Sequence, residues 1–268
     1  MSTLRARYGP WALILGASNG IGEAFAREAA GAGLNCFLVA RSEQKIAALA
    51  RELASEHGVD AVPIVANLAE RGAIDTIREA VGGRQVGLLV GNAGADPNAS
   101  HFLDAPLVDW EALVQVNIGS MLACCHHFGK AMRQRGRGGI ILVGSGACHG
   151  GGPYMATYAG AKGFALNFAE GLWHELRPHG VDVLYMALGQ TDTPAFRELL
   201  AEKGRPVPQG LASPDAVARL GIERLGHGPL LNWGLDDDEA GYLPMSAAQR
   251  RARVEMIAQA SAAVFEQP

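Results

Sequence analysis

The densest group of side chains able to do chemistry lies between Ser145 and Lys162. If this stretch is helical, the Tyr158 phenol and the Lys162 ammonium share one helix face, because residues four apart are neighbours there. A tyrosine hydroxyl titrates at about 10, so it exchanges protons at neutral pH only if a nearby positive charge, here Lys162, stabilises the phenolate. Ser145 ends an apolar run and would donate a hydrogen bond to a carbonyl oxygen. Alone, a Tyr-x-x-x-Lys pair more often lies on a solvated helix face, so the rest of the chain must decide.

A glycine-rich turn follows the first apolar run of the chain, Trp11 to Leu15. Its sequence is Gly16-Ala17-Ser18-Asn19-Gly20-Ile21-Gly22, and a helical pattern from Glu23 to Ala32 comes next. A strand, a glycine turn and a helix N-terminus in this order offer free backbone N–H groups and a favourable dipole to a phosphate. The spacing G-x-x-x-G-x-G is weak support by itself, and an ordinary tight turn is the alternative. The position directly after the first strand favours the phosphate site.

The second apolar run, Leu34 to Ala40, ends at Arg41. In dinucleotide-binding folds an acidic residue near this point binds the ribose hydroxyls of NAD, whereas an arginine accommodates the 2'-phosphate of NADP. Residues 38–42 contain no carboxylate, so the sequence favours NADP(H). The alternative is a solvated arginine that precedes a helix capped by Ser42 and running over 43–56.

The remaining elements continue an alternation of strands and helices. Further strands are expected at 61–66, 85–90, 140–144, 181–187 and 229–232, and helices at 69–81, 107–135, 153–176, 196–201, 213–225 and 247–263. This alternation predicts a parallel sheet with helices on both faces, which is a doubly wound, Rossmann-type α/β fold. Because no linker or repeat divides the chain, residues 1–268 are expected to form a single domain. Its core would span 9–194, and 195–268 would supply a substrate lid and a C-terminal extension.

Composition narrows the classes of partner. With 49% hydrophobic and 19% charged residues and a net charge of -4, the 268-residue chain shows no attraction to nucleic acid or to an anionic membrane. It has neither a membrane-spanning run nor the apolar segment of a signal peptide, so we expect a soluble, cytoplasmic protein that acts on a small molecule. Cys124, Cys125, His126 and His127 are adjacent on a helix and point in different directions, so we expect no metal site.

Taken together, these motifs resemble the short-chain dehydrogenase/reductase family over residues 9–194. The matching positions are Gly16-x-x-x-Gly20-x-Gly22, Asn92-Ala93-Gly94, Asn117, Ser145, Tyr158-x-x-x-Lys162, and Gly189 with Thr193. The resemblance implies that Tyr158 is the general acid and base, and that Ser145 orients and polarises the substrate oxygen. It further implies that Lys162 lowers the pKa of the tyrosine and holds the nicotinamide ribose, and that Asn117 supports a water that relays protons to Lys162.

The resemblance also implies a dinucleotide site. Its residues would be Gly16, Ser18, Asn19, Gly20, Ile21, Gly22, Arg41, Asn67, Leu68, Asn92, Ala93, Gly94, Tyr158, Lys162, Gly189, Thr191 and Thr193. The glycine turn would hold the pyrophosphate, and Thr193 the phosphates or the carboxamide at the nicotinamide end. Three positions depart from the family pattern: Asn67 replaces an aspartate at the adenine, Gly91 replaces an asparagine, and Leu188 replaces a proline before Gly189.

The expected activity is hydride transfer between NADP(H) and a carbonyl or secondary alcohol. The patterns at 42–56 and 88–92 look like the branch of the family that reduces steroid and long-chain 3-oxoacyl ketones, which points to a lipophilic ketone. The alternatives are an NAD-linked secondary alcohol dehydrogenase and a non-catalytic dinucleotide-sensing protein. The resemblance further implies a homodimer or homotetramer formed through the helices at 107–135 and 153–176.

Overall fold

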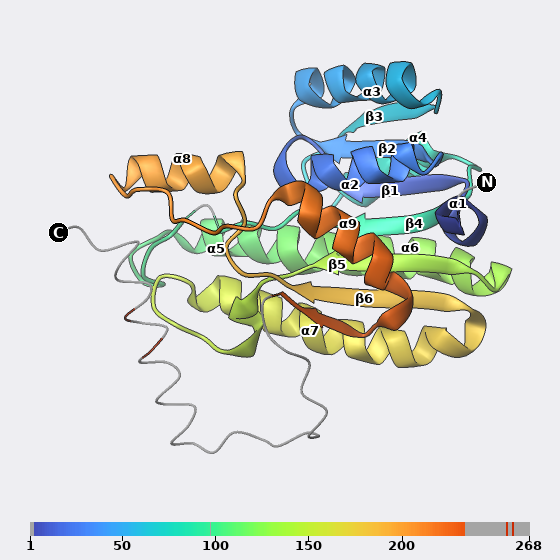
Figure 1. Ribbon diagram of the computed structural model, residues 1–268. Helices are drawn as coiled ribbons and strands as arrows, with labels where there is room; N and C mark the ends of the chain where they lie inside the picture. Colours follow the sequence, from blue (N-terminus) through green and yellow to red (C-terminus); the bar gives the residue numbers. More distant parts are fainter. Residues whose placement is uncertain (1–2, 97, 234–255, 257–258, 260–268) are drawn as a thin grey trace.

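The computed structural model describes residues 3–96 and 98–233, together with Met256 and Gln259. Within this part of the chain all strands join one parallel sheet of seven strands in the order β3-β2-β1-β4-β5-β6-β7 (Figure 1). The strands are β1 Trp11–Leu15, β2 Asn35–Ala40, β3 Ala61–Val65, β4 Val86–Gly91, β5 Gly138–Val143, β6 Val181–Ala187 and β7 Leu230–Asn232. The predicted doubly wound α/β fold is therefore confirmed.

Helices cover both faces of this sheet (Figure 1). One face carries α2 Gly20–Gly31, α3 Glu43–His57 and α9 Pro214–Arg224; the other carries α4 Ala73–Val81, α6 Ser120–Arg135 and α7 Ala156–Leu176. The remaining helices are α1 Thr3–Tyr8, α5 Leu107–Val114 and α8 Pro194–Glu202, with short 3₁₀ turns at Gly146–His149, Arg177–His179 and Leu225–His227. No helix in the described ranges is long and apolar enough to cross a membrane.

The core lies in two layers, one on each side of the sheet. Along β1, Ala12 and Ile14 pack into the layer under α2, whereas Leu13 and Leu15 pack into the layer under α4 and α6. This alternation follows from the two-residue period of a strand. Both sets are buried, which explains why the strands read as continuous apolar runs.

The strand order creates a crevice where the chain changes direction across the sheet. From β1 the chain moves outward to β2 and β3, then crosses back to place β4 on the other side of β1. The connections that leave the carboxyl ends of β1 and β4 therefore diverge, and ligands of open α/β sheets bind at such a point.

Some predicted boundaries were wrong for local reasons. The single helix expected at 107–135 is interrupted by a π-helical turn, Gln115–Gly119, between α5 and α6. The helix expected from residue 69 begins at Ala73, because a turn in which Glu70 N–H donates to Asn67 O (2.9 Å) precedes it. Helix α1 was not predicted, since it is short and polar. The helix expected at 247–263 lies outside the described residues, apart from Met256 and Gln259.

Candidate active site

The glycine turn after β1 is fixed between the ends of two neighbouring strands. Gly16 N–H donates to Val39 O of β2 at 2.8 Å, and Asn92 N–H donates to Leu15 O at 3.2 Å. The Asn92 side chain returns across the crevice, where its Nδ2 donates to Gly16 O at 3.0 Å. The turn and the Asn92-Ala93-Gly94 segment after β4 therefore form one surface at the crossover of the sheet.

This turn requires glycine at three positions. Gly16 and Gly20 have φ values of 81° and 56°, in the left-handed region that other residues rarely adopt. A Cβ on Gly22 would lie 2.0 Å from Gly16 O, so only glycine lets α2 begin this close to the turn. The N-cap residue of α2, Asn19, makes no side-chain cap hydrogen bond, and the first N–H groups of a helix, here from Gly20 and Ile21 onward, have no partner within the helix. This geometry fits a phosphate group.

The residues predicted to meet the adenosine differ in whether their side chains already have hydrogen-bond partners. Arg41 follows β2 directly, is exposed, and makes no hydrogen bond or ion pair within the described residues. Asn67 is engaged locally, because Nδ2 donates to Glu70 Oε1 at 3.0 Å and Oδ1 accepts from Ala69 N–H at 3.2 Å. The Leu68 side chain packs in the core, so only its backbone can face a ligand.

Tyr158, Lys162 and Ser145 converge at the carboxyl end of β5. Tyr158 and Lys162 lie one turn apart on α7, with Lys162 Nζ 5.3 Å from the centroid of the Tyr158 ring. Lys162 is buried, and its Nζ donates to Val143 O at 3.4 Å. Ser145, the residue after Gly144, is hydrogen-bonded through its hydroxyl to Tyr158 and also accepts the Ala147 N–H at 3.2 Å.

Burial governs the titration of this group. It lowers the pKa of Lys162 to about 8 and raises the pKa of Tyr158. The hydrogen bond from Ser145 lowers the pKa of Tyr158, and the nearby charge of Asp96 raises it. The net direction is opposite to the expectation that Lys162 lowers the pKa of the tyrosine. Desolvation of the buried phenol, which residue type and spacing do not reveal, sets the direction of this shift.

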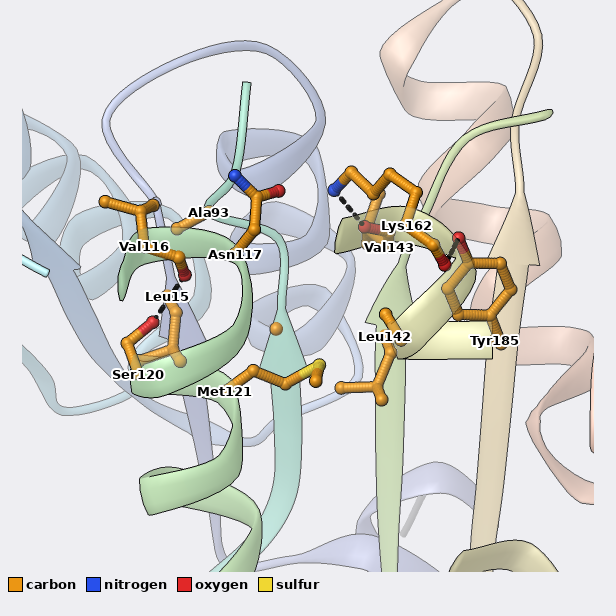
Figure 2. A pocket seen from close by; sticks show the side chains of 12 residues that line it. Leu15, Ala93, Val116, Asn117, Ser120, Met121, Leu142, Val143, Lys162 and Tyr185 are labelled. Carbon is orange, nitrogen blue, oxygen red and sulfur yellow. Dashed lines mark hydrogen bonds between the residues drawn. The ribbon is translucent and has the colours of Figure 1, made fainter. Parts of the chain in front are cut away.

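Asn117 occupies the π-helical turn between α5 and α6, and π-turns are frequent at functional sites. Its Nδ2 donates to Leu113 O at 3.0 Å, whereas its Oδ1 is buried and has no partner within the described residues. Figure 2 shows this oxygen directed toward the Lys162 ammonium. A Cβ on Gly94 would lie 2.3 Å from Asn117 Oδ1 and 3.2 Å from Lys162 Nζ, so glycine keeps this space open.

A small cavity of about 10 Å³ lies beside these groups, and it is close to the space that one water needs. It is lined on its polar side by Asn117, Ser120, Lys162 and Tyr185. An unpartnered carbonyl oxygen, a buried ammonium and this space together fit a bound water. Within the described residues no group of three His, Cys, Asp or Glu side chains could hold a metal ion.

The loop after β6 closes the crevice over the glycine turn. A Cβ on Gly20 would lie 3.1 Å from Thr193 Cγ2, which places Thr193 directly against the turn. Thr193 is the N-cap of α8, and its Oγ1 accepts the Phe196 N–H at 3.2 Å. Thr191 is buried and its Oγ1 donates to Gly189 O at 3.4 Å. Leu188, despite the missing proline, still accepts the Gly146 N–H at 2.8 Å.

Two polar groups near Tyr158 had not been singled out from the sequence. Asp96 Oδ1 accepts the N–H groups of Asn98 (2.9 Å) and Ala99 (3.3 Å), and its Oδ2 is buried without a partner in the described chain. Tyr185, from the middle of β6, reaches the same region with its hydroxyl. The sequence signal for Asp96 was its position two residues after the Asn-Ala-Gly motif. Tyr185 lies within an apolar strand and had no such signal.

The geometry can be compared with known proteins. Residues 10–204 match the family model described as short chain dehydrogenase. A 7beta-hydroxysteroid dehydrogenase of Collinsella aerofaciens is 32% identical over 225 residues, which cover 83% of this chain and 85% of the relative. A solved structure of a 7beta-hydroxysteroid dehydrogenase superposes with a TM-score of 0.80 at 31% identity, covering 87% of this chain and 90% of the other.

Two further relatives differ in what they are named for. A very-long-chain 3-oxoacyl-CoA reductase of Laccaria bicolor is 32% identical over 224 residues, covering 82% of this chain and 64% of the relative. An inactive hydroxysteroid dehydrogenase-like protein 1 of Rattus norvegicus is 34% identical over 179 residues, covering 66% of this chain and 54% of the relative.

Proposed function

Since the chain belongs to the short chain dehydrogenase family, whose members use a nicotinamide dinucleotide, we propose that it transfers a hydride between NADP(H) and a carbonyl or secondary alcohol. The observation that carries this proposal is the meeting of Ser145, Tyr158 and Lys162 at the carboxyl edge of the sheet, beside the glycine turn. We propose a lipophilic ketone, steroid- or 3-oxoacyl-like, as the substrate, because relatives are named for reactions on such molecules.

We propose that the dinucleotide lies along this crevice at the carboxyl edge of the sheet. The residues proposed to contact it are Gly16, Ser18, Asn19, Gly20, Ile21 and Gly22 at the pyrophosphate, Arg41, Asn67 and the Leu68 backbone at the adenosine, Asn92, Ala93 and Gly94 along the crevice, and Tyr158, Lys162, Gly189, Thr191 and Thr193 at the nicotinamide end. The bound dinucleotide supplies the hydride that reduces the carbonyl carbon. The glycine turn offers backbone N–H groups to the pyrophosphate, and the exposed guanidinium of Arg41 offers a positive charge to the 2'-phosphate.

The side chains of the site supply the proton. In reduction Tyr158 donates its phenolic proton to the substrate oxygen, which needs a protonated phenol, and burial raises the pKa of Tyr158 in that direction. Ser145 donates a hydrogen bond to the same oxygen and so stabilises the negative charge that develops there. In oxidation the same groups work in reverse, with Tyr158 accepting the proton of the alcohol.

Lys162 connects Tyr158 to a proton source. Because its pKa is about 8, Lys162 can release and regain a proton near neutral pH. Asn117 Oδ1 lies on its other side, unpartnered within the described residues, and would hold the water that returns a proton to Lys162. In reduction the substrate oxygen takes the phenolic proton of Tyr158. Lys162 then returns a proton to Tyr158 and regains its own from the water.

Cofactor preference is tested by titrating NADPH and NADH into the protein and into an Arg41→Ala variant, with fluorescence as the readout. Loss of a charged contact to the 2'-phosphate should weaken NADPH binding by about 10–100-fold and leave NADH binding unchanged. Arg51→Ala, an exposed arginine on α3, is the matched control and should change neither. If Arg41→Ala leaves the NADPH affinity as in the wild type, or if NADH binds more tightly than NADPH, the NADP(H) proposal is wrong.

Substrate class is tested by NADPH oxidation with a panel of ketones and aldehydes of increasing size. We expect the highest kcat/KM for bulky lipophilic ketones. A clear preference for small polar aldehydes would contradict the proposed substrate class while leaving the reaction type intact.

Two alternatives keep specific support. If Arg41 is only a solvated surface residue, the protein would be an NAD-linked secondary alcohol dehydrogenase, and NADH would bind more tightly than NADPH. The relative named as inactive favours a non-catalytic dinucleotide-binding protein. Against the latter, this chain brings together an acid, a charged amine and a hydroxyl that binding alone does not require.

The remaining proposals concern the whole chain. We propose a cytoplasmic homodimer or homotetramer, in which residues 9–194 form the core of a single domain and residues from 195 contribute a lid. Helix α8 is consistent with a lid. Its Leu200 is buried, whereas its Arg197 pairs at the surface with Asp192, just before the helix (2.5 and 2.7 Å). Mass in solution and a truncation after residue 240 would test these points.

A further inference from the structure

A buried tyrosine outside the proposed chemistry touches the backbone of two of its residues. Tyr185 projects from the middle of β6 and is fully buried. Its hydroxyl donates to Lys162 O at 3.1 Å and accepts the Ser145 N–H at 3.4 Å. Figure 2 shows the Tyr185 hydroxyl beside the Lys162 backbone, under the site. One hydroxyl thus links helix α7 to the end of strand β5.

The residue before Ser145 is matched to this tyrosine. A Cβ on Gly144 would lie 2.0 Å from Tyr185 Cζ and 2.2 Å from its hydroxyl oxygen, so any larger residue would displace the ring. The φ of Gly144 is not in the left-handed region, so the requirement for glycine is one of space rather than of backbone conformation. Gly144 and Tyr185 therefore fill one volume between them.

The hydroxyl is also placed to remain a hydrogen-bond donor. It is hydrogen-bonded with the thiol of Cys148, in the turn that follows Ser145, and burial raises the pKa of Tyr185 far above neutrality. It therefore stays protonated at any pH at which the enzyme would work.

Two further hydrogen bonds across this gap use the side chains that do the chemistry. Lys162 Nζ donates to Val143 O, and the Ser145 hydroxyl is bonded to Tyr158. These groups must exchange protons and hydrogen-bond partners during turnover, so they are poor fixed supports. Tyr185 binds backbone atoms alone at Ser145 and Lys162, and its bonds can persist through the cycle.

From this arrangement we infer that Tyr185 is a positioning residue for the proposed reaction: its hydroxyl fixes the distance between Ser145, just after β5, and the Tyr158–Lys162 pair on α7. The inference rests on the proposed function. Misplacement of reacting groups by about 1 Å can cost about 100-fold in rate, so a hydroxyl that never meets the substrate can still control turnover.

The test compares Tyr185→Phe with Tyr8→Phe. Tyr8 is also buried, and its hydroxyl donates to Asp182 Oδ2 of the same strand β6 at 2.7 Å, but at the end of the strand opposite the site. Each variant removes one buried hydroxyl bonded around β6 and keeps the ring. Stability should fall by a similar amount in both, as urea unfolding will show.

We expect Tyr185→Phe to lower kcat by about 10–100-fold while NADPH affinity stays within twofold, and Tyr8→Phe to leave both unchanged. Because the Ser145 hydrogen bond lowers the pKa of Tyr158, loosening it should also move the alkaline limb of the pH–rate profile to higher pH. A wild-type kcat and profile in Tyr185→Phe, or an equal loss of kcat in Tyr8→Phe, would overturn the inference.

A second readout does not depend on activity. Amide hydrogen exchange of the peptide containing Ser145 should be faster in Tyr185→Phe than in the wild type, since the Ser145 N–H loses its acceptor, and unchanged in Tyr8→Phe. Absence of turnover in the wild type would contradict the proposed function. The exchange rates would then still decide whether Tyr185 holds this segment, and unchanged exchange would overturn that role.

Discussion

Polar groups at the two ends of the sheet differ in whether they have hydrogen-bond partners within the described chain. At the amino end, Asp182 accepts from both Tyr8 and Arg7 at 2.7 Å, and the guanidinium of Arg135 donates to Val86 O at 2.6 Å. At the carboxyl end, Asn117 Oδ1 and Asp96 Oδ2 are buried without partners in the described chain. Unsatisfied buried polar atoms are rare in folded proteins and each calls for an explanation.

The contrast extends to charge. At the amino end the arginines are exposed or half-buried, and they donate to backbone carbonyls or pair with carboxylates. At the carboxyl end Lys162 is buried, and its pKa is lowered to about 8. The amino end contributes stability, whereas in the proposed function the groups at the carboxyl end gain their partners on binding or during reaction. Substitutions at the two ends should therefore separate stability from activity.

Among substitutions that change both activity and stability, the largest effect is expected at Lys162. Lys162→Met should lower kcat by about 100-fold or more and make the cofactor-free protein more stable at pH 7. In the folded state the pKa is below the ordinary value of 10.5, so burial of the charge costs stability fully below pH 8. The cost declines between pH 8 and 10.5, where the unfolded state binds the extra proton.

Urea unfolding of wild type and Lys162→Met at pH 7 and pH 10 measures this effect. The stabilisation should be at most roughly 3 kcal/mol at pH 7 and smaller at pH 10. Lys130→Met, on the exposed face of α6, is the control and should change neither activity nor stability. A Lys162→Met protein that is less stable than the wild type at pH 7 would contradict this reading of the carboxyl end.

A smaller effect is expected at Asp96. Because its negative charge raises the pKa of Tyr158, Asp96→Asn should lower that pKa and move the rise of alcohol oxidation with pH to lower pH. The measurement is the pH dependence of kcat/KM in the oxidative direction. Asp104→Asn, an exposed acid in the same loop, should leave the profile in place. A shift to higher pH in Asp96→Asn would show that this charge does not act on Tyr158.

The smallest effect on activity is expected at the amino end. Arg84 Nε donates to Val81 O at 3.0 Å, and its guanidinium lies over the rings of Trp11 (5.1 Å) and Phe37 (4.7 Å). Arg84→Ala should cost about 1 kcal/mol of stability, or a few degrees in Tm, with kcat within twofold of the wild type. A loss of activity larger than the loss of folded protein would break the separation between the two ends.

The fold could be predicted from the sequence because the central parallel strands β1, β2, β4, β5 and β6 are buried on both faces. Such strands appear as continuous apolar runs, and glycines follow three of them, β1, β5 and β6, at Gly16, Gly144 and Gly189. The π-helical turn at 115–119 could not be found this way, since one added residue hardly disturbs the apolar pattern from α5 to α6. The spacing therefore did not show that Asn117 lies in this turn, where its side-chain oxygen is directed toward Lys162.

The candidate site was predictable only in part. Residue type and spacing place Tyr158 and Lys162 on one helix face, and that is how they lie. The net direction of the Tyr158 pKa could not be predicted, because it depends on burial by residues distant in sequence. Tyr185 and Asp96 could not be predicted in the same way. The hydrogen bond of Tyr185 to Lys162 O, and the burial of Asp96 Oδ2 without a partner in the described chain, arise only when β6 and the loop after β4 come close to α7.

The central claim is that the carboxyl edge binds a nicotinamide dinucleotide and that Tyr158 then moves the proton. The direct measurement is Tyr158→Phe beside the wild type in one preparation, with NADPH binding followed by fluorescence and ketone-dependent NADPH oxidation followed by absorbance. We predict binding within a few-fold of the wild type and turnover reduced on the order of 10³-fold. Turnover within tenfold of the wild type, or a wild-type protein that binds neither NADPH nor NADH, would contradict the account.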